Sequence, residues 1–276
     1  MNEASFLSVS KKSGIGIVEG EHVIPLADGI SMLEVMERGF DVYAREEPIP
    51  LQECQLFSPI DRPRKNILCV GRNYYDHALE MGGEQGVPEE LVVFTKASTS
   101  IIGHKDTIIV SHNLTNQLDY EGELAVIIGR EGKSIPKEKA MEYVFGYTIL
   151  NDITARDLQK KHGQFFLGKS MDTFCPLGPV IVTKDEIEDP HQLMLETFVN
   201  GEKRQSSSTS KMMRKIEELI SEISSVLTLE RGDVIATGTP AGVGKGFHPP
   251  KFLKDGDQVT VKIEKIGELV NNVKFN

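Results

Sequence analysis

Asp119, Glu121 and Glu123 stand at alternate positions directly before an apolar run, residues 124–128. The β-branched residues of this run, and Gly129 at its end, predict a strand, on which alternate side chains share one face. Like charges on one face of a strand that enters a core repel one another unless a cation neutralises them. Oxygen-only ligands suit Mg²⁺, Mn²⁺ or Ca²⁺. The spacing therefore indicates either a divalent metal site or a solvated acidic edge of a strand.

Another acidic residue, Asp152, follows the strand predicted at residues 144–150. The end of a strand is a common place for a residue that does chemistry, and also for a helix N-cap. Arg156 and Gln159 follow Asp152 at helical spacing. This pattern fits both a helix that carries site residues and an ordinary amphipathic helix.

His77 and Glu80 follow a short apolar run, residues 66–71, which predicts a buried strand. One helical turn would place the two side chains on the same side. A carboxylate beside an imidazole can fix its tautomer and raise its basicity, which gives a dyad that activates water. The alternative is a surface pair on a polar helix. The glycine-rich residues 81–88 come next and are either a mobile lid or a simple loop.

Two further glycine-rich segments could bind anions. Residues 237–244, a Gly/Thr loop after a predicted strand, can offer amides and hydroxyls to a carboxylate or phosphate, or form only a tight turn. Residues 163–170 satisfy the bare Walker A expression, with Lys169 at the lysine position. However, no predicted strand precedes them, and bulky residues 165–167 occupy a loop whose amides should wrap phosphate. We therefore do not predict a P-loop.

The composition excludes several classes of protein. The 276 residues contain 31 Lys and Arg against 41 Asp and Glu, a net charge of −10, which argues against nonspecific binding of nucleic acid or an anionic membrane. The three cysteines are widely spaced without a CxxC pattern, which favours a reducing compartment. Neither a signal-peptide pattern nor an apolar run of membrane-spanning length occurs. We expect a cytoplasmic protein that acts on a small molecule, without nucleic-acid or membrane partners.

The chain divides into two predicted parts. Short strands between residues 5 and 26 and a helix from the capping box Ser31–Glu34 to about Arg38 form a small N-terminal subdomain, residues 1–60. A charged, proline-bearing connector at residues 44–65 leads into a main domain, residues 61–276.

The main domain shows many short strand patterns and few helices, without regular βαβ alternation. The dipeptide Asn200-Gly201 predicts a hairpin, and a second hairpin is expected around Ile266. The longest predicted helix covers residues 210–227, where apolar residues recur at three- and four-residue spacing. The class is therefore α+β and rich in strands.

Taken together, these motifs resemble the fumarylacetoacetate hydrolase family from about Asp61 to the end of the chain. Several separate motifs in the same order are more specific than any one of them. The closest resemblance is to the bacterial branch of 2-hydroxyhepta-2,4-diene-1,7-dioate isomerases and acylpyruvase-like enzymes. The matching segments are Cys69–Tyr74 with His77 and Glu80, Tyr120–Val126, Asn151–Gln159, Gly168–Phe174 and Thr237–Gly244.

The resemblance implies a mixed β-sandwich roll, a homodimer and one Mg²⁺ or Mn²⁺ per subunit. Residues 1–60 match only loosely and carry no site motif. Position by position, the resemblance implies metal ligands at Glu121, Glu123 and Asp152, a water-activating dyad at His77 and Glu80, and substrate contacts at Arg156, Gln159, Lys169 and Thr239.

The chemistry of such a site suits a 2-oxo acid, whose carboxylate and keto oxygen can chelate one metal. Cleavage of an acylpyruvate leaves the enolate of pyruvate, which the metal would stabilise. Lys169 would add a second cation, and Arg156 would hold an anionic end of the substrate. We expect an Mg²⁺-dependent hydrolase that cleaves the C–C bond of an acylpyruvate or related β-diketo acid. The alternatives are a 2-hydroxyhepta-2,4-diene-1,7-dioate isomerase or an oxaloacetate decarboxylase on the same site, or a catalytically idle metal-binding protein.

Overall fold

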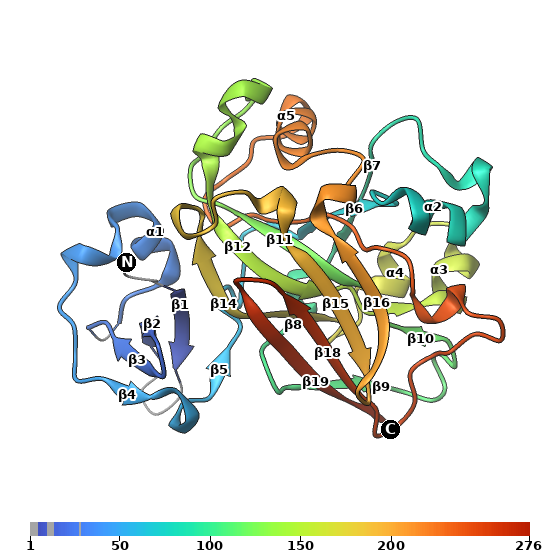
Figure 1. The fold of residues 1–276 in the computed structure, drawn as a ribbon, viewed down its shortest axis with the longest axis horizontal. Helices are drawn as coiled ribbons and strands as arrows, with labels where there is room; N and C mark the ends of the chain where they lie inside the picture. The colour runs from blue at the N-terminus through green and yellow to red at the C-terminus, as the bar shows by residue number, and fades with distance from the viewer. Residues whose placement is uncertain (1–4, 10–13, 28) are drawn as a thin grey trace.

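The computed structural model describes residues 5–9, 14–27 and 29–276, and it is built mainly of strands (Figure 1). The larger sheet has the strand order β4-β3-β2-β1-β14-β12-β11-β17-β6-β7, with β5 beside β1 and β8 beside β14. Most neighbours are antiparallel, but β17 with β6 and β14 with β8 are parallel, so the sheet is mixed. Its strands are β1 (Ser5–Val9), β2 (Gly14–Glu19), β3 (His22–Pro25), β4 (Ile49–Pro50), β5 (Leu56–Phe57), β6 (Ile67–Gly71), β7 (Val92–Lys96), β8 (Ile101–Ile102), β11 (Gly122–Ile128), β12 (Val144–Asn151), β14 (Cys175–Thr183) and β17 (Val234–Ala236).

A second sheet packs against the first, and Figure 1 shows it at the front of the molecule. Its strands, in spatial order, are β16 (Glu202–Ser208), β15 (Met194–Val199), β18 (Gln258–Ile263), β19 (Gly267–Phe275) and β9 (Thr107–Val110). A short pair, β10 (Leu118–Asp119) and β13 (Thr154–Ala155), lies beside these sheets. Leu124 of β11, Leu195 of β15 and Val261 of β18 belong to one core cluster between the sheets. The alternate side chains Ala125 and Ile127 belong to a second core on the opposite face, so β11 is buried on both faces.

Helices cover the ends of this sandwich. Figure 1 shows α2, α3 and α4 grouped at one end, away from the N-terminal segment. The α-helices are α1 (Met32–Arg38), α2 (Tyr75–Gly82), α3 (Arg156–His162), α4 (Phe166–Lys169) and α5 (Ile216–Val226). Short 3₁₀ turns are η1 (Phe40–Val42), η2 (Leu51–Glu53), η3 (Glu84–Gly86), η4 (Ser98–Ser100), η5 (Lys137–Tyr143), η6 (Lys184–Glu186), η7 (Pro190–Gln192), η8 (Thr209–Lys211) and η9 (Gly244–Gly246). Within the described ranges, no helix is long and apolar enough to cross a membrane.

Two local predictions are confirmed and a third is corrected. The capping box at Ser31 starts α1, and the Asn200-Gly201 turn joins β15 to β16, with both residues at positive φ. The helix predicted from residue 210 begins only at Ile216. The preceding backbone is bound elsewhere, because the side chain of Asn73 accepts the N–H of Arg214 at 2.9 Å and donates to its carbonyl at 3.0 Å. A backbone that is paired in this way cannot form the first helical turn.

The N-terminal segment shares its sheet and its core with the rest of the chain. β1 pairs antiparallel with β14, and Val35 of α1 lies in the same core cluster as Ile127 and Leu150. Figure 1 shows this segment at one side of the sandwich, opposite the group of α2, α3 and α4. The division into residues 1–60 and 61–276 stays a prediction.

Candidate active site

Three carboxylates meet where β11 begins and β12 ends. Glu121 directly precedes β11, Glu123 lies on β11, and Asp152 directly follows β12. The strands are antiparallel neighbours, with Gly122 opposite Asn151, so the start of one lies beside the end of the other. The three side chains are buried, and each offers an oxygen atom within 4.8 Å of the others. The structure thus brings together the three positions at which the sequence predicts metal ligands.

Two buried lysines neutralise part of this charge. The Nζ of Lys169 donates to Glu121 at 2.6 Å and to Asp152 at 2.5 Å, while Lys96 of β7 donates to the other oxygen of Asp152 at 2.7 Å. Burial alone would lower the pKa of Lys169, but Asp152 and Glu121 raise it above its ordinary value. Each oxygen of Asp152 therefore accepts from one lysine, and Lys169 links Asp152 to Glu121.

Arg156 completes the neutralisation of Glu121. Its Nη2 donates to Glu121 at 2.6 Å, its Nε to Asp119 at 2.8 Å and its Nη1 to Gln159 at 3.3 Å. Burial would raise the pKa of Glu121, but the charges of Arg156 and Lys169 hold it well below its usual range. Glu121 is thus an anion that is held between two cations.

Glu123 differs from its two neighbours, because it forms no ion pair with any residue that the structure describes. Its one hydrogen bond is donated by the backbone N–H of Gly238 at 2.8 Å. Burial, together with the charges of Asp152 and Glu121, raises its pKa well above the ordinary value. A buried carboxylate without a cation is costly. This all-oxygen cluster therefore fits a small hard cation such as Mg²⁺ or Mn²⁺, and Glu121, Glu123 and Asp152 would hold it.

Asp119 does not share a face with Glu121 and Glu123, and in this respect the sequence-based prediction is wrong. The single strand predicted over residues 119–129 is broken at residues 120 and 121, because Asp119 pairs with β13 whereas β11 pairs with β12. Asp119 instead accepts the N–H groups of Gly244 at 2.6 Å and Lys245 at 3.0 Å, besides the guanidinium of Arg156. It positions the arginine rather than joining the carboxylate cluster.

His77 and Glu80 face each other on α2, as their spacing predicts. The Nδ1 of His77 lies 3.3 Å from Oε2 of Glu80. The other oxygen, Oε1, accepts the N–H of Gly242 at 3.0 Å. A Cβ atom at Gly246 would lie 2.0 Å from Oε1, so only glycine leaves room for this carboxylate. The dyad is therefore held from both sides, by α2 and by the loop that precedes η9.

A cavity of about 200 Å³ connects these groups. The predicted catalytic and substrate-contact residues line it with the exception of Glu80, and so do Glu121 and Glu123 of the carboxylate cluster. Glu80 contacts His77 instead, and the oxygens of Asp152 accept from Lys169 and Lys96. The lining residues are Val70, Gly71, Arg72, His77, Met81, Phe94, Glu121, Glu123, Arg156, Gln159, Lys160, Phe165, Lys169, Thr239 and Lys245.

The two glycine-rich segments take different roles from those of an anion-binding loop. In residues 237–244 the amides of Gly238, Gly242 and Gly244 bind the chain's own carboxylates, at Glu123, Glu80 and Asp119. The segment that satisfies the Walker A expression carries Lys169 on the short helix α4, with its ammonium bound to carboxylates. This geometry agrees with the rejection of a P-loop.

Four cationic residues of the site were missed by the sequence reasoning. Lys96 ends an apolar strand, and a buried lysine on such a strand requires a carboxylate partner. An ion pair of Lys96 could therefore have been predicted from the sequence. Arg72, Lys160 and Lys245 come from three separate segments and converge only in the folded chain.

The chain is similar to proteins of known families. A family model of the fumarylacetoacetate (FAA) hydrolase C-terminal domain matches residues 66–274. The chain is 57% identical over 223 residues to the oxaloacetate tautomerase YisK of Bacillus subtilis, an alignment that covers 81% of this chain and 74% of that protein.

Solved structures show the same architecture over nearly the whole chain. The fumarylacetoacetate hydrolase of the psychrophilic Exiguobacterium antarcticum matches with a TM-score of 0.87 and 48% identity, covering 99% of this chain and 100% of that one. The 2-hydroxyhepta-2,4-diene-1,7-dioate isomerase of Mycobacterium marinum matches with a TM-score of 0.82 and 34% identity, covering 100% and 99%. These matches confirm the predicted β-rich sandwich roll. They also show that proteins named as a hydrolase and as an isomerase share it.

Proposed function

This chain belongs to the fumarylacetoacetate hydrolase family of enzymes, and on that premise we propose that it interconverts the keto and enol forms of oxaloacetate or a related 2-oxo diacid. One observation carries the proposal. Glu121 and Glu123 of the carboxylate cluster, Lys169, and His77 of the dyad line a single cavity. A tautomerase needs these parts: a base for a carbon-bound proton and positive charge for the enolate that results.

Arg156 and Gln159 are suited to hold the carboxylate of the 2-oxo acid. Of the five N–H donors of an arginine, three are engaged with Asp119, Glu121 and Gln159. Two donors remain, and the side chain lines the cavity. Because Asp119 and Glu121 fix the guanidinium plane, the arginine meets the substrate in a single orientation.

His77 is the proposed base. The carboxylate of Glu80 beside Nδ1 favours the tautomer with the proton on that nitrogen, which leaves Nε2 free to accept one. In the proposed reaction Nε2 takes a proton from carbon 3 of the 2-oxo acid and a proton is returned to the oxygen at carbon 2. Lys169 supplies a fixed positive charge beside this oxygen.

The metal completes this arrangement. When held by Glu121, Glu123 and Asp152, Mg²⁺ or Mn²⁺ would supply a Lewis acid that stabilises negative charge on the oxygen of an enolate. Glu123 supports this assignment most directly, since its buried charge has no other partner among the described residues.

Hydrolysis of an acylpyruvate is the second candidate, and one feature favours it. His77 and Glu80 are positioned as a complete pair, which hydrolysis requires in order to activate water. Decarboxylation of oxaloacetate and isomerisation of a dienol diacid would use the same positive charge around the enolate. The site geometry therefore supports an enolate intermediate more strongly than it supports any one reaction product.

The test is a substrate screen with the Mg²⁺-loaded protein. Oxaloacetate, acetylpyruvate, fumarylpyruvate and a dienol diacid are compared, and tautomerisation, C–C cleavage and CO₂ release are scored separately. We expect the ultraviolet absorbance of enol-oxaloacetate to decay fastest, and the His77→Ala variant to slow this decay. If the absorbance of enol-oxaloacetate decays at the rate in buffer and acetylpyruvate is cleaved rapidly, the proposed tautomerase is rejected and the hydrolase is favoured. Binding without any turnover would favour an idle metal-binding protein.

A homodimer is also part of this proposal, as the family resemblance implies. Light scattering coupled to size-exclusion chromatography would measure the mass in solution, and a mass of one chain would reject the dimer.

A further inference from the structure

Three cations at the cavity have no carboxylate partner among the residues that the structure describes. Arg72 follows β6, Lys160 lies on α3 and Lys245 lies in η9, and all three line the cavity. Within the described parts of the chain, none of them forms an ion pair with an acidic side chain. The guanidinium of Arg72 donates only to the carbonyl of Gly86, at 3.1 Å. By contrast, Arg156 and Lys169 are already neutralised by Asp119, Glu121 and Asp152.

The three cations share one cavity, and the charges of Lys160 and Arg72 reach Lys245. Burial and the charge of Arg156 lower the pKa of Lys245 and Asp119 opposes them, while Lys160 and Arg72 lower it further by smaller amounts. Asp119 compensates this charge only in part, because its oxygens also accept from Arg156 and from three backbone amides. The folded chain can keep these like charges together only if an anion enters the cavity or if solvent and salt screen the repulsion. In a chain of net charge −10, such a concentration of positive charge indicates an anionic ligand.

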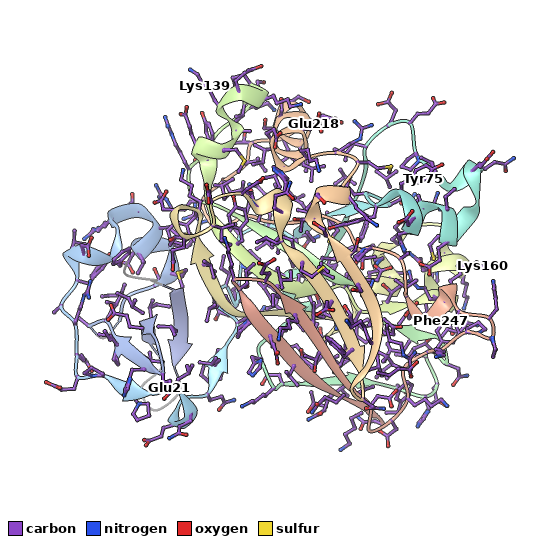
Figure 2. The ribbon with its side chains drawn as sticks, in the orientation of Figure 1. Glu21, Tyr75, Lys139, Lys160, Glu218 and Phe247 are labelled. Atoms are coloured by element: carbon purple, nitrogen blue, oxygen red, sulfur yellow. The ribbon has the colours of Figure 1, made fainter. Side chains whose placement is uncertain are left out.

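The backbone around two of these cations is held in place. The amides of Gly244 and Lys245 are bound to Asp119, and two residues later the ring of Phe247 lies 5.6 Å from the guanidinium of Arg204. Lys160 lies in the last turn of α3, where the helix dipole favours a cation. Figure 2 labels Lys160 and Phe247 at the same edge of the molecule. Only the side chains need to move in order to meet a ligand.

We propose that Arg72, Lys160 and Lys245 form a subsite for the second carboxylate of a 2-oxo diacid whose 2-oxo acid head is held by Arg156, Gln159 and Lys169. This inference rests on the proposed function of the cavity as a 2-oxo acid site. It adds a prediction of substrate specificity, because the subsite distinguishes diacids from monoacids such as acetylpyruvate. The residues that bind the head make no such distinction.

The test compares matched pairs of ligands on matched variants. The pairs are 2-oxobutanoate with oxaloacetate, and 2-oxopentanoate with 2-oxopentanedioate; within each pair the chain length is equal and only the terminal carboxylate differs. The variants are Lys160→Met, Lys245→Met and their double combination. Lys161→Met is the control, because Lys161 is the next residue of α3 and does not line the cavity. Arg72 is left intact because it also binds Gly86.

Isothermal titration of the Mg²⁺-loaded protein measures each affinity. For at least one pair, we expect the wild type to prefer the diacid by ~10-fold or more. Each single substitution should lower that ratio by ~3-fold and the double substitution by ~10-fold, as for partly exposed charge pairs. Affinity for the monoacids should stay within about 2-fold in all variants, and Lys161→Met should change neither value. Added salt should weaken the preference in the wild type.

Two outcomes would overturn the inference, and they can be told apart. The subsite is wrong, and the proposed function stands, if the monoacids bind and the double variant keeps the full preference for diacids. The same conclusion follows if the monoacids bind and the wild type shows no preference for diacids. If no 2-oxo acid binds the Mg²⁺-loaded wild type, the proposed function is wrong and the subsite fails with it.

Discussion

Replacing Glu123 by glutamine should abolish metal binding without weakening the metal-free protein. Glu123 is buried, forms no ion pair with a described residue and accepts one hydrogen bond, from Gly238 at 2.8 Å. Glutamine is isosteric and keeps an oxygen that can accept this bond. It also removes the repulsion from Asp152 and Glu121. We therefore expect the free energy of unfolding in EDTA to fall by no more than ~0.5 kcal/mol, the usual range for a substitution that breaks no specific interaction, or to rise.

Glu121→Gln, two residues earlier, is the matched control. Glu121 is equally buried but forms ion pairs with Arg156 at 2.6 Å and with Lys169 at 2.6 Å. Removing one partner of a buried ion pair costs about 3–5 kcal/mol. Since Arg156 and Lys169 each keep a second carboxylate partner, we expect the free energy of unfolding to fall by about 3 kcal/mol. At roughly 2–4 °C per kcal/mol, Tm in EDTA should fall by about 6–12 °C.

Thermal melting followed by circular dichroism, in EDTA and then at rising Mg²⁺ or Mn²⁺, separates these effects. Free metal at 100 times its Kd stabilises the folded state by about 2.7 kcal/mol, so the wild-type Tm should rise by roughly 5–11 °C. Both variants should lose this rise, although only Glu121→Gln starts from a lower Tm. The reasoning is refuted if Glu123→Gln keeps the metal-induced rise, or if it melts far below the wild type in EDTA.

Three further predictions concern the dyad and its surroundings. Gly246→Ala should displace the carboxylate of Glu80, because the new Cβ would lie 2.0 Å from Oε1 of Glu80. Turnover should fall by ~10–10²-fold with Tm nearly unchanged, and wild-type activity in this variant would contradict the assigned geometry. Residues 76–90 should gain protection from hydrogen exchange when oxalate saturates the Mg²⁺-loaded protein, and unchanged protection would reject the lid hypothesis. His77→Ala should lower any acetylpyruvate cleavage by ~10²-fold but oxaloacetate decarboxylation distinctly less, since only cleavage needs an activated water; equal losses would contradict this.

Local rules predicted those parts of the fold in which the residues decide the geometry by themselves. The capping box at Ser31 starts a helix because its hydroxyl and Glu34 bind the first free amides, whatever surrounds them. The Asn200-Gly201 turn forms because both residues tolerate positive φ. Glu121 and Glu123 share a site, as the alternation of side chains predicts, although Glu121 stands one residue before β11. In each case the information lies within a few residues.

Parts of the fold that depend on a distant partner were not predictable in this way. The helix predicted from residue 210 starts at Ile216 because Asn73, 141 residues before Arg214, binds the intervening backbone. Asp119 leaves the acidic face because its strand pairs with Thr154 instead of continuing into β11. Neither pairing has a signal in the local sequence. Both errors therefore arise from a tertiary hydrogen bond that overrides a local pattern.

The loop from Thr237 to η9 explains why the motifs of this site occur together. Its amides hold Glu123, Glu80 and Asp119, which belong respectively to the carboxylate cluster, to the dyad and to the support of Arg156. One segment therefore binds three groups that lie far apart in the chain and fixes them relative to one another. A side chain at Gly246 would strike Glu80, and a Cβ at Gly244 would come within 2.7 Å of Asp119. Gly244 and Gly246 thus leave room for the carboxylates that lie against the loop. Because the chain's own carboxylates occupy the amides of Gly238, Gly242 and Gly244, the substrate is left to the cations of the cavity.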